Sequence, residues 1–414
     1  MDSDFIKPKV IKPTPPKEKN VPQTPTIPVS KPPISDEESI KDTEEVASEM
    51  PTKKKPTKPK RKSFKQWYKD LSKKQKILLF FILFLFIGGL SAGAVFAFSS
   101  KQVDAPPPPT VVVKKEEPKP TTEASRLTGI QVEPALNKRQ VTGIMIENSP
   151  DARPQSALNQ AGVVFEAVAE GGITRFLTLF QESQPDYIGP VRSVRPYYLD
   201  WVQGFDAAIV HAGGSPEGLA KIRSDGVKDI DHGANGAAFT RVNNRYAPHN
   251  LYTSMAKLDE VSNKRGYTSS TFEGFPRKTE KAIAVPTAKA IDLNISSYLY
   301  NARYDYDAAS NSYKRSEGGK PHTDEKSGTQ LSPKVVIAMV MSYGQRGIYS
   351  VYNAVGSGKV YIFQDGGVTE GTWQKEGSKT QITFSDSAGA PIKLNPGQTW
   401  LSAVSGAEKV KYTP

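Results

Sequence analysis

The sequence predicts a membrane-anchored protein in which an α+β or α/β domain precedes a smaller, mostly antiparallel β domain. Three observations lead to this prediction: an uncharged run at 77–98, a strand followed by a glycine-rich turn and a capped helix at 207–217, and short, regularly spaced strands after residue 282. The predicted parts are a cytoplasmic tail (1–76), a transmembrane helix (77–98), a linker (99–126), a first domain (127–280) and a second domain (281–414).

The run from Ile77 to Phe98 contains 22 residues without a charge. At about 1.5 Å per residue it reaches roughly 33 Å, which matches the hydrocarbon core of a bilayer. The segment from Lys53 to Lys76 carries twelve Lys or Arg and one acid, which places the N-terminus in the cytoplasm. We therefore expect a single-pass protein of the cell membrane with its C-terminal domains outside. A cleaved signal peptide is the alternative, but 76 residues before the run are too many for a usual one.

The formal net charge of +12 is concentrated near the predicted membrane helix. The first 76 residues hold 19 basic and 11 acidic side chains, against 36 and 32 in the rest. This distribution favours contact with anionic lipid headgroups, or a role in topology alone, over binding to nucleic acid.

Residues 1–60 hold twelve prolines and almost no aromatic residue, which predicts a disordered tail. Its Pro-rich pieces, Pro13–Pro16 and Pro25–Pro28, suggest either a docking segment for a protein partner or a spacer. The linker contains a second proline run, Pro106–Pro109.

The chain has no cysteine. This excludes disulfides, a lipid attached to an N-terminal Cys, a Cys nucleophile such as that of a cysteine transpeptidase, and Cys-ligated zinc or iron–sulfur clusters. A hydrophobic core alone must stabilise the folded part.

Alternating and apolar runs predict the elements of both domains. In the first domain we expect strands at Val141–Glu147, Gly162–Ala169, Ile173–Gln181 and Ala207–His211, a helix at Val194–Gln203, and a helix that starts at Ser215-Pro216-Glu217. In the second we expect strands at Val335–Ser342, Lys359–Gln364, Val368–Gln374, Gln381–Phe384 and Thr399–Val404, with a hairpin turn at Asp365-Gly366-Gly367.

Glycine, proline, arginine and histidine next to apolar strands between residues 144 and 252 predict loops at strand ends, where binding sites usually lie. The helix beginning at Ser215 predicts an anion site, because unpaired N–H groups at a helix start attract negative charge and neighbouring arginines donate bidentate hydrogen bonds. The alternative is that Ser215 only caps the helix, the glycines shape a turn, and the arginines pair with Glu166, Glu170 or Asp200. The candidate ligand-binding residues are Arg153, Arg175, Arg192, Ser193, Arg195, His211, Gly213, Gly214, Ser215, His249 and Asn250.

Catalysis is left open by the sequence. A hydrolase would use Ser193 or Ser215 with His211 or His249, but the spacing Gly213-x-Ser215-x-x-Gly218 misses the G-x-S-x-G elbow by one residue. Glu166 and Glu170 suggest either glycoside chemistry or partners for arginine. The four histidines, with Asp229 and Asp231, fit none of the compact zinc patterns, so we predict no metal and no cofactor.

The first domain carries the motifs ARPQS, EGGITRF, GPVRSVRPY, HAGGSP and APHNLYT, and the second carries KPHTD, GTW and NPGQTW. In these motifs the chain, from about Leu127 to its end, resembles the YerB-like family of bacterial envelope lipoproteins, a two-domain family of unknown function. The resemblance implies an extracytoplasmic protein, an α/β-type first domain and a second domain rich in β structure.

The chain departs from that family in its anchor and at two positions. Relatives are commonly held by a lipid on an N-terminal Cys, whereas this chain has a predicted membrane helix. Ser149 stands where relatives often carry His, and Ala157 where they often carry Gly. If that His were catalytic in relatives, this chain would be impaired.

We therefore expect a membrane-anchored envelope protein that binds an anionic wall or membrane-surface ligand. The alternatives are an envelope hydrolase or transferase that uses His, Glu, Ser or a metal, and a transmembrane scaffold with a protein partner on its Pro-rich tail.

Overall fold

The computed structural model describes residues 65, 68–69, 71–78, 80 and 121–414, and the chain divides into two compact units, 1–112 and 113–414. In the first unit, residues 73–78 are helical. Within the described residues no helix is long and apolar enough to cross a membrane. Of the predicted span, only Ile77, Leu78 and Phe80 are described, so the transmembrane helix stays a prediction. The cytoplasmic tail before residue 65 and the proline run of the linker also lie outside the described residues.

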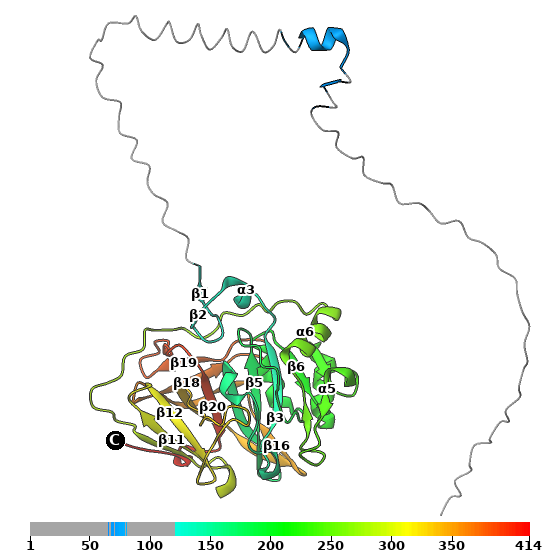
Figure 1. Ribbon diagram of the computed structural model, residues 1–414. Helices are drawn as coiled ribbons and strands as arrows, with labels where there is room; N and C mark the ends of the chain where they lie inside the picture. Colours follow the sequence, from blue (N-terminus) through cyan, green and yellow to red (C-terminus); the bar gives the residue numbers. More distant parts are fainter. Residues whose placement is uncertain (1–64, 66–67, 70, 79, 81–120) are drawn as a thin grey trace, which may run out of the picture. The chain divides into compact units, whose positions relative to one another are not determined.

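A 12-stranded mixed sheet forms the centre of the second unit (Figure 1). Its main path runs in the order β19-β18-β17-β14-β20-β4-β5-β3-β6-β7, and β16 joins it beside β4 and carries β15. The chain before residue 232 contributes β3 (Thr142–Glu147), β4 (Val163–Glu170), β5 (Ile173–Phe180), β6 (Ala208–His211) and β7 (Asp229–Asp231). The second half contributes β14 (Val335–Val340), β15 (Tyr343–Arg346), β16 (Tyr349–Tyr352), β17 (Gly356–Gln364), β18 (Gly367–Lys375), β19 (Thr383–Asp386) and β20 (Thr399–Val404).

The central strands are buried except at some end residues, as expected for apolar runs such as VVIAMV in β14, where only Val340 is partly exposed. Strands β14, β20 and β4 run parallel to one another, and so do β3, β6 and β7. The pair β20–β4 joins residues 399–402 to 163–166, so strands from both halves of the chain share one sheet.

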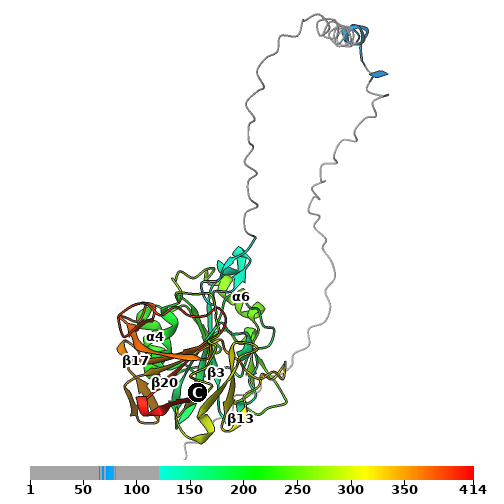
Figure 2. The ribbon, with the colours of Figure 1, turned by 90° about the vertical axis from the view of Figure 1, so that its left-hand side faces the viewer.

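Different elements pack against the two faces of this sheet (Figure 2). Helix α4 (Pro196–Gln203) lies on the face of Phe165, whose ring stacks on Trp201 at 5.1 Å. We call this the helix side. The opposite face, that of Glu166 and Phe176, packs against the second sheet, and we call it the sheet side. Trp400 lies there, with its ring 5.3 Å from Phe176.

The second sheet has five antiparallel strands in the order β13-β12-β11-β10-β21. They are β10 (Ala290–Leu293), β11 (Ala302–Asp307), β12 (Ser312–Glu317), β13 (Lys320–Pro321) and β21 (Val410–Thr413). An α/β-type first part and antiparallel strands in the second part agree with the predicted fold class. The strands between residues 335 and 404, however, join the large mixed sheet, and the separate antiparallel sheet is formed by β10–β13 and β21.

The remaining elements are short or lie at the periphery. They are β1 (Glu123–Ala124), β2 (Gln131–Val132), α3 (Pro134–Asn137), α5 (Pro216–Asp225), β8 (Thr240–Arg241), β9 (Leu251–Tyr252) and α6 (Met255–Lys264).

Most predicted elements are present, with ends displaced by a few residues. The helix predicted from Val194 begins at Pro196, because Arg195 is extended and the proline occupies the first helical turn. The strand predicted at Gln381–Phe384 lies at Thr383–Asp386. The predicted hairpin turn joins β17 to β18, and Asp365 and Gly366 both have positive φ there. The strands β10, β11 and β12 were not predicted, although β11 (ARYDYD) alternates apolar and polar side chains; β12 (SYKRSE) does not.

Candidate functional site

Six charged side chains lie along one edge of the large sheet on its helix side. They are Glu147, Glu170, Arg175, Arg192, Arg195 and His249, and we call them the charged row. Backbone hydrogen bonds hold the segment that carries Arg192 and Arg195 between β3 and the turn after β6: Glu147 N donates to Pro190 O (2.9 Å) and Val194 N donates to Gly213 O (3.0 Å). The row thus stands at the carboxyl ends of β3 and β6, the usual location of ligand sites in parallel sheets.

Glu170 holds two of the arginines. Its carboxylate accepts from Arg175 Nη2 at 2.6 Å and pairs with Arg195. Burial alone would raise the pKa of Glu170, but attraction by Arg175 and Arg195 outweighs it and lowers that pKa. Arg175 also donates to Ser193 O at 2.7 Å, and Arg195 lies 4.9 Å above the ring of Tyr349. Arg175 and Arg195 are therefore fixed inside the protein.

Glu147 organises the other end of the row. Its Oε1 lies 2.9 Å from His249 Nδ1 and accepts from Ser149 Oγ at 2.9 Å, while Oε2 lies 3.3 Å from Arg192 Nε. Ser149 Oγ is also 3.2 Å from His249 Nδ1. The other ring nitrogen, Nε2, faces outward, 4.0 Å from the exposed Asp151.

Arg192 is the least satisfied cation of the row. Its Nε is buried without a hydrogen bond, as are those of Arg175 and Arg195, but Arg175 and Arg195 each donate two other hydrogen bonds, whereas the Arg192 side chain makes none to the described residues. Burial lowers the pKa of Arg192, and repulsion from Arg175 and Arg195 adds to this, although Glu147 opposes it. About a quarter of the side chain (26%) is exposed, so the guanidinium can reach a ligand in solvent.

A cavity of about 230 Å³ adjoins the Arg195 end of the row. It lies between α4, the start of α5 and β16, and its wall combines three tyrosines with charged residues of both signs. The lining includes Arg195, Tyr197, Ser215, Glu217, Tyr349 and Tyr352. Arg195 and Ser215, both predicted from the sequence, therefore line the same cavity, but Glu217 adds a negative charge there.

The helix start itself has the architecture of a simple cap. Ser215 Oγ accepts from Gly218 N at 3.1 Å, and Gly213, with φ 67°, donates its N–H to Asp231 at 2.9 Å. Gly214 pairs with Val194 in an isolated parallel bridge. These contacts match the alternative in which the serine caps and the glycines shape a turn.

His211 is completely buried next to this turn, away from Ser193 and Ser215. Its Nδ1 lies 2.8 Å from Gly213 O, and its Nε2 lies 2.8 Å from Asp229 Oδ1. These two contacts fix the orientation of the ring. In the described residues the serine that contacts a histidine is Ser149, not either of the serines considered from the sequence.

The two other predicted residues lie apart from the row. Asn250 accepts from Arg241 at 2.8 Å and donates to Val242 O, so it fixes a loop. Arg153 donates to the side chain and the backbone of Asn148, both at 3.0 Å, and stacks 5.2 Å from the ring of Tyr300.

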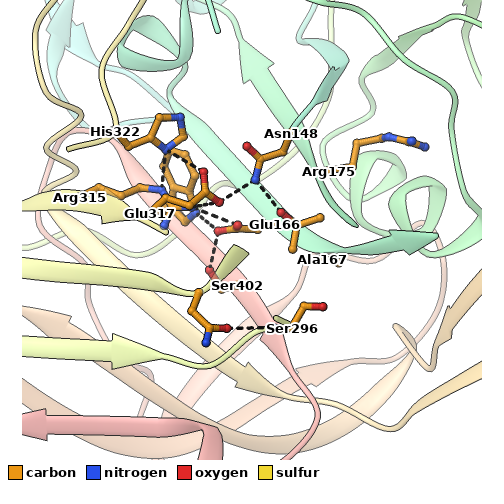
Figure 3. Close-up of polar contacts among 12 residues, drawn as sticks. Asn148, Glu166, Ala167, Arg175, Ser296, Arg315, Glu317, His322 and Ser402 are labelled. Atoms are coloured by element: carbon orange, nitrogen blue, oxygen red, sulfur yellow. Dashed lines mark hydrogen bonds and ion pairs between the residues drawn. The ribbon is translucent and has the colours of Figure 1, made fainter. Parts of the chain in front are cut away.

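A second polar cluster lies on the sheet side (Figure 3). Asn148, the residue after Glu147 of the charged row, donates a hydrogen bond to Glu317 of this cluster. Arg315 Nη2 is shared between Glu166 (3.1 Å) and Glu317 (3.2 Å), and all three side chains are buried. Figure 3 shows that Arg175 points away from this cluster. Sequence reasoning missed Arg315 and Glu317, because no spacing links them to Glu166; the KPHTD motif next to them was the available signal.

No three His, Asp or Glu side chains in the described part of the chain converge as ligands of a metal ion. His232 packs against Phe239 with ring centroids 5.2 Å apart, and His322 belongs to the buried cluster.

Comparison with known proteins gives matches to both halves of the folded part. Residues 127–268 match the family model described as the N-terminal domain of a protein of unknown function (DUF3048), and residues 291–401 match the corresponding C-terminal domain. The candidate lipoprotein YerB of Bacillus subtilis (strain 168) is 32% identical over 290 residues, which cover 67% of this chain and 85% of that protein. A crystal structure of the YerB protein from Bacillus subtilis superposes with a TM-score of 0.64 at 28% identity, and covers 70% of this chain and all of that chain.

Proposed function

The chain belongs to the DUF3048 family, as its motifs predict, and on this premise we propose that it is a membrane-anchored envelope protein that binds an anionic ligand at the charged row. The ligand that we propose carries phosphate or carboxylate groups, as anionic wall polymers and membrane lipids do. Arg192 is the proposed direct contact.

This proposal is based mainly on the incomplete pairing of Arg192. Three arginines pair with two glutamates, one of which also contacts His249, so the arginines alone outnumber the glutamates of the row. Arg175 and Arg195 share Glu170, and Glu147 is shared between Arg192 and His249. An anion at Arg192 would supply acceptors for a half-buried guanidinium and reduce its repulsion from the other two arginines.

The envelope location rests on the predicted membrane helix and on likeness to YerB. That relative is a candidate lipoprotein, and this chain, without cysteine, would reach the same surface through the helix predicted at 77–98. The two proteins would be anchored by different means, but either anchor would place the folded part next to anionic lipids and wall polymers.

Replacement of Arg192 tests the proposal. We expect Arg192→Ala to weaken binding of a soluble poly(glycerol phosphate) by about tenfold, the effect of losing one or two charge-assisted hydrogen bonds. Arg303→Ala is the matched control, because Arg303 is an exposed arginine of β11 that pairs with Asp292 and Asp305. Dihexanoyl phosphatidylglycerol, compared with its phosphatidylcholine counterpart, tests whether the ligand is a lipid. Equal binding by wild type and Arg192→Ala to both anionic probes would exclude the row as the site.

Acid–base catalysis is a second candidate function, favoured by the pairing of Glu147 with His249. A carboxylate on Nδ1 orients the imidazole and leaves Nε2 directed outward, as in carboxylate–histidine pairs of hydrolases. Ser149 lies on the Nδ1 side, so it is not placed as a nucleophile for Nε2. Turnover of wall fragments that is lost in His249→Ala and kept in Arg303→Ala would support this function.

A further inference from the structure

A second cavity, of about 190 Å³, opens on the sheet side beside the buried cluster. It lies between the loop after β3 and the strand β13. Its lining consists of Arg153, Pro154, Glu317, Lys320, Pro321, His322 and Thr323. None of these residues except Arg153 belongs to the candidate residues predicted from sequence.

Glu317 lines this cavity and has one carboxylate oxygen without a hydrogen bond. Its Oε1 accepts from Asn148 Nδ2 at 2.7 Å and from Arg315 Nη2 at 3.2 Å. Its Oε2 is buried and has no hydrogen-bond partner among the described residues, although Arg153 Nη2 lies 3.4 Å away. Only 2% of the side chain is exposed, and the recorded polar neighbours of this oxygen are Arg153 Nη2 and, at 3.6 Å, His322 Nδ1, so it lacks a hydrogen bond of ordinary length.

The hydrogen bonds of His322 fix it as a neutral ring. Its Nδ1 accepts from Arg315 Nε at 3.0 Å, and its Nε2 donates to Gln155 Oε1 at 2.8 Å. Burial lowers the pKa of His322, and repulsion from Arg315 and Arg153 lowers it further. His322 therefore neither competes for a proton at neutral pH nor contributes charge.

The charged groups that face Glu317 are Arg315, Arg153 and Glu166, and Lys320 stands at the rim. With Glu317 ionised, the two arginines balance the two glutamates, and Lys320 leaves one positive charge. With Glu317 protonated, the excess is two positive charges. Both states leave a net positive charge for a singly charged anion, but only the protonated carboxyl can donate a hydrogen bond to it.

We propose that the cavity binds a terminal carboxylate, of a small acid or of a peptide, between Arg153, Lys320 and the protonated carboxyl of Glu317. One ligand oxygen accepts from the guanidinium, and the other accepts the hydrogen bond that Glu317 Oε2 donates. The proton stays on Glu317, and no covalent step takes place.

The electrostatics of the site favour this proton. Burial and the neighbouring Glu166 raise the pKa of Glu317 to about 7, against the attraction of Arg315 and Arg153. The protonated form therefore predominates at pH 6 and is the minor form at pH 8. Carboxylate affinity should therefore fall by about tenfold between these two pH values.

The probes for the test are acetate, the dipeptide Ala-Ala and Ala-Ala amide, titrated into the full chain in a mild detergent. We expect acetate and Ala-Ala to bind, and Ala-Ala amide, which lacks the carboxylate, not to bind. Tighter binding of Ala-Ala than of acetate would identify a peptide end as the ligand, and equal binding would identify a small acid.

Two substitutions distinguish binding from a structural role of the cluster. Glu317→Gln keeps an oxygen for Asn148 and Arg315 and directs an N–H₂ donor to the cavity, so it should bind Ala-Ala at pH 8 as tightly as wild type does at pH 6. Lys320→Ala should weaken binding several-fold, while Lys314→Ala, an exposed lysine of β12 that pairs with Asp307, should not.

Three results would overturn the proposal. They are no binding of acetate or Ala-Ala to the wild type at pH 6, the same pH dependence in Glu317→Gln as in wild type, and equal weakening by Lys320→Ala and Lys314→Ala. Since Arg192 lies on the helix side, Arg192→Ala should leave Ala-Ala binding unchanged. The proposal of anion binding at the charged row and the proposal of carboxylate binding in this cavity can therefore be refuted independently.

Discussion

Ala157 is buried in a left-handed backbone conformation, with φ 73° and ψ 10°. This region is unfavourable for residues with a Cβ by about 1–2 kcal/mol, while glycine adopts it without that cost. The family resemblance, which implies glycine at this position in many relatives, is consistent with this backbone.

We predict that Ala157→Gly stabilises the fold by about 0.5–1 kcal/mol, because the relief of strain exceeds the added entropy of the unfolded chain. Urea unfolding measures the change. Ala161→Gly is the control: Ala161 has φ −67° and is equally buried, so glycine there should destabilise by about 1 kcal/mol. Destabilisation by both substitutions would show that the left-handed conformation is not strained.

Single residues of the site were predictable where their role is local. The sequence predicts that Ser215 caps a helix and that Gly213 lies in a turn, because capping and turn formation depend on the neighbouring backbone. The partners of Glu147 and Glu317 were not predictable, because His249 and Asn148 approach them only through the tertiary fold. No spacing in the sequence records that a carboxylate lies beside a histidine about a hundred positions away.

At the scale of elements, a bulge in β4 decides which arginines are paired. The register shifts between Val168 and Glu170, and this moves Glu170 to the helix side, while Glu166 stays on the sheet side. The two glutamates, four positions apart in the sequence, would share a face of a regular strand. The bulge instead assigns Glu166 to the buried cluster and Glu170 to the charged row.

We predict that Glu170→Gln destabilises the fold by about 2 kcal/mol at pH 7, since it leaves Arg175 and Arg195 without their anion in a partly exposed site. The pKa of Glu170 is lower in the folded state than its ordinary value of 4.5. Its contribution is therefore present above pH 4.5 and is lost as the pH falls through the folded-state pKa.

Urea unfolding of wild type and Glu170→Gln at pH 7 and pH 3 tests this sign. The difference between the two proteins should shrink at pH 3, where the carboxyl is increasingly protonated. Glu376→Gln, at an exposed position, should change stability by less than about 0.5 kcal/mol at either pH. A difference that grows at low pH would contradict the role of Glu170 as the anion of this pair.

At the scale of the whole molecule, the two family domains share one sheet. The parallel pair β20–β4 aligns Thr399 with Val163, and β14 follows beyond β20. Local patterns identified these strands, and Thr399–Val404 was predicted to the residue. They could not reveal a pairing across more than 200 positions, because strand propensity carries no information about distant partners.

We predict that residues 121–414 unfold in one cooperative transition, because removal of either half would expose the edge and the apolar faces of the shared sheet. Hydrogen exchange at increasing urea concentrations should show β3 and β14 opening at the same free energy. Opening of β14 well before β3 would show that the two halves unfold independently.

The central claim is that an anion binds at Arg192, and a crystal structure of the protein with a glycerol phosphate oligomer tests it most directly. The account predicts a phosphate within hydrogen-bond distance of the Arg192 guanidinium, with Arg175 and Arg195 still paired to Glu170. A phosphate bound away from the charged row, with Arg192 still in contact only with Glu147, would contradict it.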